Sequence, residues 1–184
     1  MRGRAKVFLF IFMLAFAPVV ANAGDPFYLR EGSVVHVLEN EKYFPALMEK
    51  IRGAKKSIKI CMYLFKTTDS PNNLANQVLD ALAGAAKKGV AVEALLEAND
   101  RPDDNLNDHN RQTAGKLRKA GIKARFDRRD VNTHSKLVVI DGEWVFVGSH
   151  NLTHTALSRS HETSLMVRSR ELAEYFSRYI EDIE

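Results

Sequence analysis

The sequence predicts an α/β sandwich around a mixed β-sheet, and three observations support this prediction. Short runs rich in β-branched and aromatic residues alternate with segments whose apolar residues recur every three to four positions. The 184 residues are 45% hydrophobic and 27% charged, as in globular chains and unlike disordered or membrane-embedded ones. Neither a linker nor an internal repeat interrupts the alternation, so a single domain is expected.

Each predicted element follows from its local pattern. Residues 43–56 are expected to form a helix because their apolar residues share one face, and a second helix over 74–88 ends at Gly89. The polar, proline-bearing segment 97–110 is expected to be a loop. The remaining expected elements are strands over 33–38, 57–65, 90–96, 122–126, 137–140, 144–147 and 161–167, and helices over 111–120 and 171–180.

The first 23 residues are expected to be a signal peptide, which leaves 24–184 as the folded domain. Three basic residues precede the largely apolar run 7–20, and Ala21-Asn22-Ala23 offers the small-x-small pattern that signal peptidase cleaves. The run is shorter than the roughly 20 residues of a membrane span. We therefore expect a periplasmic or secreted protein without membrane insertion after cleavage, with an uncleaved membrane anchor as the alternative.

The stretch THSKLVVIDGEWVFVGSHN, residues 133–151, sets two apolar arms around an Asp-Gly pair. Asp141 and Gly142 predict a two-residue type I′ turn, because both central positions of that turn require positive φ. Such a turn places Ile140 opposite Glu143. Asp141 then lies roughly 20 Å from the open ends of the arms, at about 3.3 Å per residue, which indicates a structural role for its side chain.

The same pairing brings polar side chains together at the open ends of the arms. His134 is expected opposite Ser149, and Lys136 and Asn151 point the same way because strand side chains alternate between faces. Lysine and an amide can donate hydrogen bonds to a phosphodiester, and a neutral imidazole can attack phosphorus to form a covalent intermediate. Glu162 is the candidate that orients the second nitrogen of His134. Cationic side chains stabilise the developing charge in such a scheme, so it requires neither a metal nor a cofactor.

The spacing H-x-K-x4-D-x6-G-S-x-N resembles the HKD signature of the phospholipase D superfamily, and its members are His134, Lys136, Asp141, Gly148, Ser149 and Asn151. Glu162 stands at a downstream position that this family also uses. In length and order of elements, the chain resembles the small bacterial endonucleases that carry one such motif. The resemblance implies an α-β-α sandwich, His134 as the nucleophile, and catalysis without a divalent metal.

A single motif has a consequence for assembly. In the family that the chain resembles, two motifs share one site: one histidine attacks phosphorus and the other protonates the leaving oxygen. The resemblance therefore implies a homodimer that brings two His134 side chains together, and an isologous interface supplies that pairing.

The charge balance excludes a strongly basic nucleic-acid binder. The chain holds 27 Lys and Arg against 23 Asp and Glu, and without its first 23 residues the balance is 24 against 23. Local clusters would have to steer an anionic substrate. The basic residues shortly before His134 are expected to bind it, with a solvated strand edge as the alternative, and they are Lys123, Arg125, Arg128 and Arg129.

Three functions remain open on these observations. The first is a non-specific endonuclease that hydrolyses DNA, and RNA as a further substrate, through a phosphohistidine. The second is a phospholipase D that uses the same chemistry on phospholipid head groups. The third is a non-catalytic phosphate-binding module.

Several other residues carry alternative interpretations. A zinc site is conceivable from histidines downstream of the hairpin, although they lack cysteine or carboxylate partners at ligand spacing. Cys61 is the only cysteine, which excludes an internal disulfide, and its strand context indicates a buried, inert thiol. Trp144 and Phe146 are expected in the core. The histidines of the zinc alternative are His150, His154 and His161.

Overall fold

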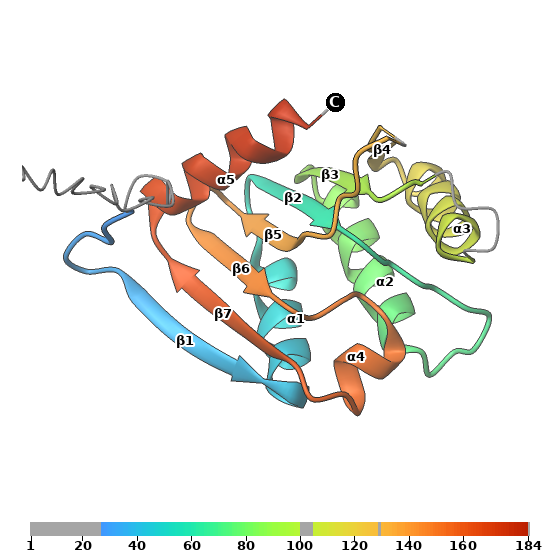
Figure 1. Ribbon diagram of the computed structural model, residues 1–184, viewed down its shortest axis with the longest axis horizontal. Coiled ribbons are helices and arrows are strands. Elements are labelled where there is room, and N and C mark those ends of the chain that lie inside the picture. The colour runs from blue at the N-terminus through green and yellow to red at the C-terminus, as the bar shows by residue number, and fades with distance from the viewer. Residues whose placement is uncertain (1–26, 100–104, 129, 184) are drawn as a thin grey trace, which may run out of the picture.

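The computed structural model describes residues 27–99, 105–128 and 130–183. The expected signal peptide, residues 1–23, lies outside them. A seven-stranded sheet runs through the domain in the order β1-β7-β6-β5-β2-β3-β4 (Figure 1). Its strands are β1 (Val34–Glu39), β2 (Ser57–Met62), β3 (Ala91–Leu96), β4 (Lys123–Phe126), β5 (Lys136–Ile140), β6 (Trp144–Gly148) and β7 (Thr163–Arg168). The helices are η1 (Asn40–Lys42), α1 (Tyr43–Gly53), α2 (Leu74–Lys87), α3 (Leu106–Lys119), α4 (His154–Ser158) and α5 (Arg170–Asp182).

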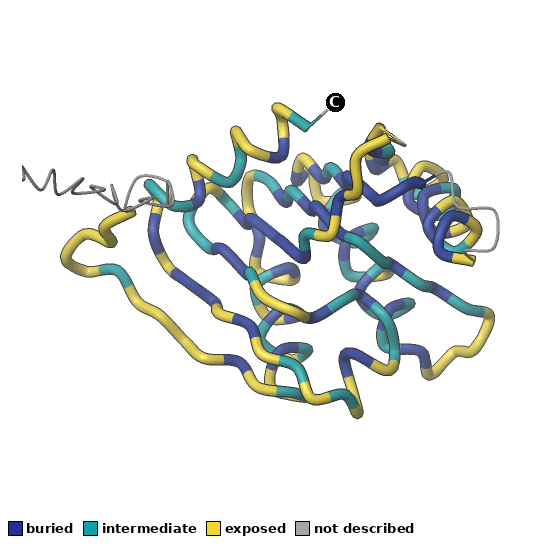
Figure 2. The backbone as a smooth tube through the Cα atoms, viewed as in Figure 1, coloured by how far each residue is buried: buried dark blue, intermediate teal, exposed yellow. Residues whose placement is uncertain are grey.

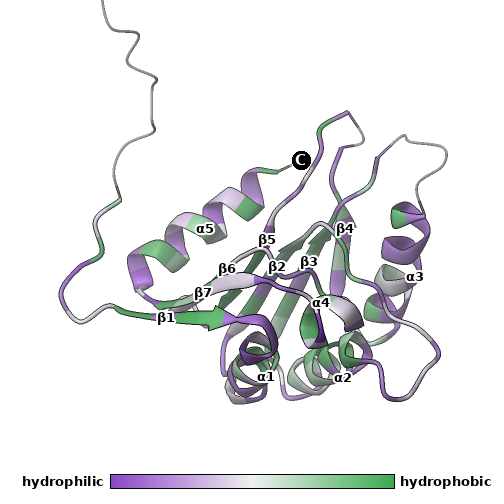
Figure 3. Cartoon of the chain, turned by 60° about the horizontal axis from the view of Figure 1, so that its bottom comes forward, coloured by the Kyte–Doolittle hydropathy of each residue, from purple (hydrophilic) through white to green (hydrophobic). Residues whose placement is uncertain are grey.

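The sheet is mixed, as the sequence predicts. Strands β2, β3 and β4 are parallel, whereas β5, β6, β7 and β1 join through antiparallel pairs. Helices α1 and α2 cover one face and α5 lies on the other, which completes the α-β-α sandwich (Figure 3). Because β5 runs against β2 and β6 runs against β5, the carboxyl ends of β2, β3, β4 and β6 meet the amino end of β5 at one edge of the sheet.

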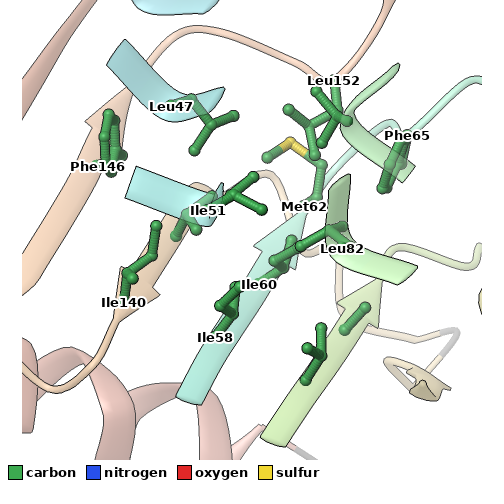
Figure 4. Close-up of a cluster of buried hydrophobic side chains, with 14 of the residues drawn as sticks. Leu47, Ile51, Ile58, Ile60, Met62, Phe65, Leu82, Ile140, Phe146 and Leu152 are labelled. Carbon is green, nitrogen blue, oxygen red and sulfur yellow. The ribbon is translucent and has the colours of Figure 1, made fainter. Parts of the chain in front are cut away.

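Two layers of apolar side chains hold the sandwich together. Buried residues are concentrated along the central strands of the sheet (Figure 2). The larger layer lies between the sheet and α1 and α2, where Leu47, Ile60, Leu82 and Phe146 are at most 1% exposed (Figure 4). The smaller layer lies under α5 and includes Cys61. Burial raises the pKa of the Cys61 thiol to about 12, so the thiolate that would react is scarce at neutral pH.

The expected loop over 97–110 is wrong in its second half, because α3 already begins at Leu106. Its first turns bury the amide side chains of Asn107 and Asn110 beside Leu106. The side chain of Asn107 accepts a hydrogen bond from the backbone amide of Asn99 and donates one to its backbone carbonyl. The side-chain amide of Asn110 donates to the backbone carbonyls of Tyr63 and Glu97. A helix that packs through asparagine shows no apolar period, so the pattern of this segment resembles that of a loop.

The turn between β5 and β6 has the expected conformation but a different register. Asp141 and Gly142 have φ of 57° and 65°, yet Ile140 pairs with Trp144 and not with Glu143. Glu143 does not pair with β5, because its carbonyl accepts a 2.9 Å hydrogen bond from the Ser169 amide. The added residue shifts the pairing by one, so the expected alignment of His134 with Ser149 is corrected.

The carboxylate of Asp141 anchors this turn to the start of β2. It accepts the backbone amides of Lys55, Lys56 and Ser57 at 2.9, 2.7 and 3.1 Å. Burial by itself would raise the pKa of this carboxyl group, but the amide hydrogen bonds outweigh burial and hold the pKa below its ordinary value.

Substituting Asp141→Asn is therefore expected to lower the free energy of unfolding by about 1.5 kcal/mol at pH 7, because charge-assisted hydrogen bonds are lost. A carboxyl group with a depressed pKa in the folded state stabilises above its unfolded pKa, and this contribution is lost as the pH falls through the folded pKa. The difference in unfolding free energy between wild type and Asp141→Asn should thus begin to narrow below about pH 3.9, the ordinary pKa of aspartate. Urea unfolding at pH 7 and pH 3 measures it, with exposed Asp80→Asn as the control; an equal gap at both pH values would contradict this account.

Candidate active site

Four of the predicted site residues line one open hollow at the sheet edge described above. The hollow has a volume of about 360 Å³, and its walls are His134, Lys136, Gly148, Ser149 and Asn151. A second hollow of about 300 Å³ adjoins it and shares His134 as a wall residue. The alternation of side chains along a strand does not bring these residues together, because His134, Ser149 and Asn151 all lie just beyond the strand ends.

His134 presents an exposed imidazole to both hollows. The ring packs against the ring of Tyr63 with centroids 4.4 Å apart and planes tilted by 59°. Burial lowers the pKa of His134 below its ordinary value of 6.5, and the charge of Lys136 lowers it further. At neutral pH the imidazole is therefore mostly uncharged, with one nitrogen that carries a lone pair.

Lys136 is 8% exposed and reaches the same hollow from the first position of β5. Its Nζ donates a 2.7 Å hydrogen bond to the backbone carbonyl of His134 and lies 4.7 Å from the centroid of the Tyr63 ring. Burial lowers the pKa of Lys136, while the charge of Glu162 opposes this shift. Tyr63 thus contacts both basic groups of the site. The sequence carries no signal of this role, because an aromatic residue that follows a buried strand usually belongs to the core.

Glu162 contacts Ser149 and not the histidine it was expected to orient. Ser149 Oγ donates to the Glu162 carboxylate and accepts the Thr163 amide at 3.0 Å. Over residues 27–99, 105–128 and 130–183, no hydrogen bond joins Glu162 to His134. The expected role of Glu162 within this chain is therefore corrected: the carboxylate fixes the serine hydroxyl, because the bend after β6 brings Ser149 next to it.

Asn151 holds an unused hydrogen-bonding group at the wall of the hollow. Its Oδ1 is buried and has no hydrogen-bond partner among the described residues. The two ends of a side-chain amide exchange by rotation, so this end can present either an acceptor or two N–H donors to a ligand. A buried polar atom without a partner is costly, and a bound phosphate oxygen would satisfy the amide in its donor orientation.

Gly148 makes the approach of Ser149 to β7 possible. A Cβ built on Gly148 would lie 2.4 Å from both the Cα and the Oγ of Ser164 and 2.5 Å from the carbonyl oxygen of Thr163. No side chain fits in this space. The glycine of the motif therefore has a packing reason, and it sets where the chain leaves β6 and turns into the hollow.

The basic stretch before His134 does not line the site as one group, which corrects the expectation for it. Lys123 is the first residue of β4 and therefore lies at the end of the strands away from the hollow, where it pairs with Glu93 at 3.2 Å. The guanidinium of Arg125 donates to the carbonyls of Ile180 and Ile183. Arg128 lines the second hollow beside His134, and Arg129 lies outside the described residues.

The zinc alternative does not fit the histidines it requires. Both ring nitrogens of His150 are engaged, one with Ser164 at 2.8 Å and the other with the carbonyl of Asn40 at 2.9 Å. His154 accepts the amide of Leu74, which caps α2. In the described part of the chain, no three histidine, cysteine or acidic residues are grouped to hold a metal ion. The same part contains no helix that is long and apolar enough to cross a membrane.

Comparison with known proteins agrees with the motif. The chain matches the family described as "Cardiolipin synthase, PLD-like domain" over residues 47–183. Cardiolipin synthase B of Shigella flexneri is 31% identical over 139 residues, which cover 70% of this chain and 32% of that protein. The mitochondrial cardiolipin hydrolase of Canis lupus familiaris is 26% identical over 168 residues, which cover 91% of this chain and 58% of that protein. The chain thus spans only about a third to just over half of these relatives.

Two small solved structures share the fold over nearly their whole length. Nuc, a phospholipase D family member from Salmonella typhimurium, superposes with a TM-score of 0.67 at 24% identity, covering 82% of this chain and 93% of Nuc. NucT from Helicobacter pylori gives a TM-score of 0.64 at 20% identity, covering 82% of this chain and 95% of NucT. With the HKD spacing, the converging side chains and the family match over residues 47–183, the chain belongs to the phospholipase D-like family.

Proposed function

We propose that this protein is a metal-independent phosphodiesterase, and that its substrate is nucleic acid, cleaved without sequence preference. The observation that carries the proposal is the state of His134: an exposed imidazole with a lowered pKa, on the wall of an open hollow, beside a lysine ammonium and an unpartnered amide. A neutral imidazole is a nucleophile, and fixed cationic and polar donors stabilise a phosphoryl transition state.

The reaction follows in two displacements. A nitrogen of His134 attacks phosphorus, the N–P bond forms, and the bond from phosphorus to the leaving oxygen breaks with proton transfer to that oxygen. Water then attacks the phosphohistidine, a base takes the water proton, and the N–P bond breaks to release the phosphate product and neutral His134. The Lys136 ammonium and the Asn151 amide donate to the non-bridging oxygens throughout. Ser149 is held by Glu162 at the rim, within reach of the same oxygens.

The proton donor for the leaving oxygen comes, in this proposal, from a second subunit. Among the described residues that line either hollow, His134 is the only histidine, and one imidazole cannot attack phosphorus and protonate the leaving oxygen at once. A twofold dimer that joins two such hollows supplies the second imidazole and keeps the same surface on both partners.

Two features favour nucleic acid as the substrate. The two hollows meet at His134, so an extended phosphodiester backbone can continue past the cleaved bond on either side. Arg128 lines the second of them with half of its side chain exposed, and although it pairs with the exposed Asp130 at 3.4 Å, it can contact a neighbouring phosphate.

Phospholipid is the second candidate, and the named relatives favour it. Cardiolipin synthase B and mitochondrial cardiolipin hydrolase act on phospholipid by name, and the second matches 91% of this chain. The same histidine chemistry would serve a lipid phosphodiester. Exposed apolar side chains before and on the outer strand β1 and on its neighbour β7 could contact acyl chains, and they are Phe27, Tyr28, Val35, Val37 and Leu165.

A parallel assay separates the two substrates. The protein from Gly24 onward is incubated in excess EDTA with plasmid DNA and, separately, with vesicles of phosphatidylcholine and cardiolipin. Nicking of DNA without lipid turnover supports the proposal, whereas lipid turnover without nicking replaces it with the second candidate. Loss of all activity in EDTA would contradict the metal-free scheme, and binding of phosphate without turnover of either substrate would indicate a non-catalytic module. Export is proposed from the sequence alone, and a mature chain that begins at Gly24 would support it.

The pH dependence of kcat/KM gives a prediction about the shared site. One His134 has to be neutral and its twin protonated, and the fold lowers the pKa of this imidazole below 6.5. We therefore expect a bell-shaped profile with its maximum on the acid side of pH 6.5. A plateau that extends above pH 8 would contradict the use of a histidinium as the proton donor.

A further inference from the structure

The placement of His134 depends on its backbone, because its imidazole makes no hydrogen bond to any described residue. The ring packs against Tyr63, and this contact has no hydrogen-bond direction of its own. The chain must therefore fix the segment that carries the ring. Three consecutive residues, Thr133 to Ser135, lie across the carboxyl ends of the three parallel strands on their way from β4 to β5.

Each of these three strand ends holds this segment through one hydrogen bond. At the end of β2, the Tyr63 amide donates to the Ser135 carbonyl at 2.8 Å. Beyond β3, the carboxylate of Glu97 accepts the Thr133 amide at 2.6 Å. Beyond β4, the carboxylate of Asp127 accepts from the Thr133 hydroxyl.

The two acidic residues are buried far more deeply than carboxylates usually are. Glu97 is 0% exposed, Asp127 is 6% exposed and Thr133 is 6% exposed. Burying a carboxylate is costly unless it is hydrogen-bonded. Both strands also extend their ladders by one residue, because the Glu97 amide donates to Met62 and the Asp127 amide donates to Leu96. The carboxylates are therefore fixed by the sheet itself, and Thr133 bonds to both of them.

We propose that Thr133 is a positioning residue for His134, and that Glu97 and Asp127 act through it to set where the imidazole stands in the hollow. The inference rests on the proposed role of His134. It assigns a function to two buried acidic residues that lie outside the HKD spacing, and it explains why a threonine with both a donor hydroxyl and a donor amide precedes the histidine.

The test compares two buried threonines. Thr133→Val keeps the shape and the amide but removes the hydroxyl, and Thr133→Ser restores the hydroxyl. The matched control is Thr113→Val in α3, whose hydroxyl is 0% exposed and donates to the Phe65 carbonyl at 2.6 Å. We expect Thr133→Val to lower kcat by about 10- to 100-fold with little change in KM, because a displacement of about 1 Å can cost a factor of that size. Thr133→Ser should recover most of the loss, and Thr113→Val should leave kcat unchanged.

A second readout does not require turnover. The imidazole proton resonances of His134, assigned by their absence in His134→Asn, are followed in all variants. They should move in Thr133→Val, return in Thr133→Ser and stay in place in Thr113→Val. Unchanged resonances in folded Thr133→Val, or equal losses of kcat in both valine variants, would overturn the inference.

If wild type cleaves none of the substrates, the proposed function fails and the resonances alone decide the positioning role. If Thr133→Val does not fold, Asp127→Asn replaces it, since this change preserves volume and weakens the same hydrogen bond. Unchanged resonances in that variant would overturn the inference equally.

Discussion

Replacing His134 with asparagine is expected to reduce kcat by at least about 10⁴-fold, because removal of the attacking nucleophile leaves only binding and electrostatic contributions. The free energy of unfolding should change by less than about 0.5 kcal/mol, since the side chain is exposed and makes no hydrogen bond to a described residue. His36→Asn, at an exposed histidine of β1, is the control that should retain full activity. Residual turnover within tenfold of wild type would contradict the role of His134.

The same variant measures whether the site is shared. Mixed preparations are made by refolding wild type and His134→Asn together at several ratios. If each dimer has one site that needs two imidazoles, activity should follow the square of the wild-type fraction. A linear dependence would show that each chain acts alone and would contradict the shared site.

The second large effect is expected at Gly148. Substituting Gly148→Ala should lower the free energy of unfolding by about 3 kcal/mol, because the added Cβ would lie 2.4 Å from the Cα of Ser164 and the strands must part. Activity in the folded fraction should also fall, since the chain turns into the hollow at this point. Thermal and urea unfolding measure the first effect, and turnover per folded molecule measures the second.

Gly84→Ala provides the matched control. This glycine lies within α2, where an added Cβ meets nothing within 4 Å. The substitution should stabilise the protein by about 0.5 to 1 kcal/mol, as alanine favours helix. If Gly148→Ala were as stable as wild type, the close packing of β6 against β7 would not be the reason for glycine in the motif.

The spacing of the HKD motif predicted which residues form the site but not how they are arranged. The positive φ values of Asp141 and Gly142 follow from the residue types, and the structure has them. The register does not follow, because it depends on the bond between Glu143 and Ser169 across the sheet. The polar side chains still converge, since β5 begins and β6 ends at the same edge, and loop geometry then replaces strand alternation.

Other features had no local signal. The positive charge of the two arginines does not predict their different positions. Arg125 donates to two carbonyls at the end of α5, whereas Arg128 lies beside the histidine. Nor does charge predict that Glu97 is fully buried, because a carboxylate in a polar stretch usually lies in solvent. These placements depend on contacts between distant segments, which only the packed sheet defines. The family, the sandwich and the mixed sheet, in contrast, follow from patterns within short windows.

The central claim is that His134 forms a transient bond to phosphorus, and trapping that bond tests it most directly. Enzyme is mixed with an excess of a short radiolabelled phosphodiester, quenched in alkaline denaturant within the first turnover, and digested for mass spectrometry. The account predicts a phosphorus adduct on the peptide that carries His134, in proportion to enzyme and absent from His134→Asn. Rapid turnover with no adduct on that peptide, or with an adduct on another residue, would contradict it.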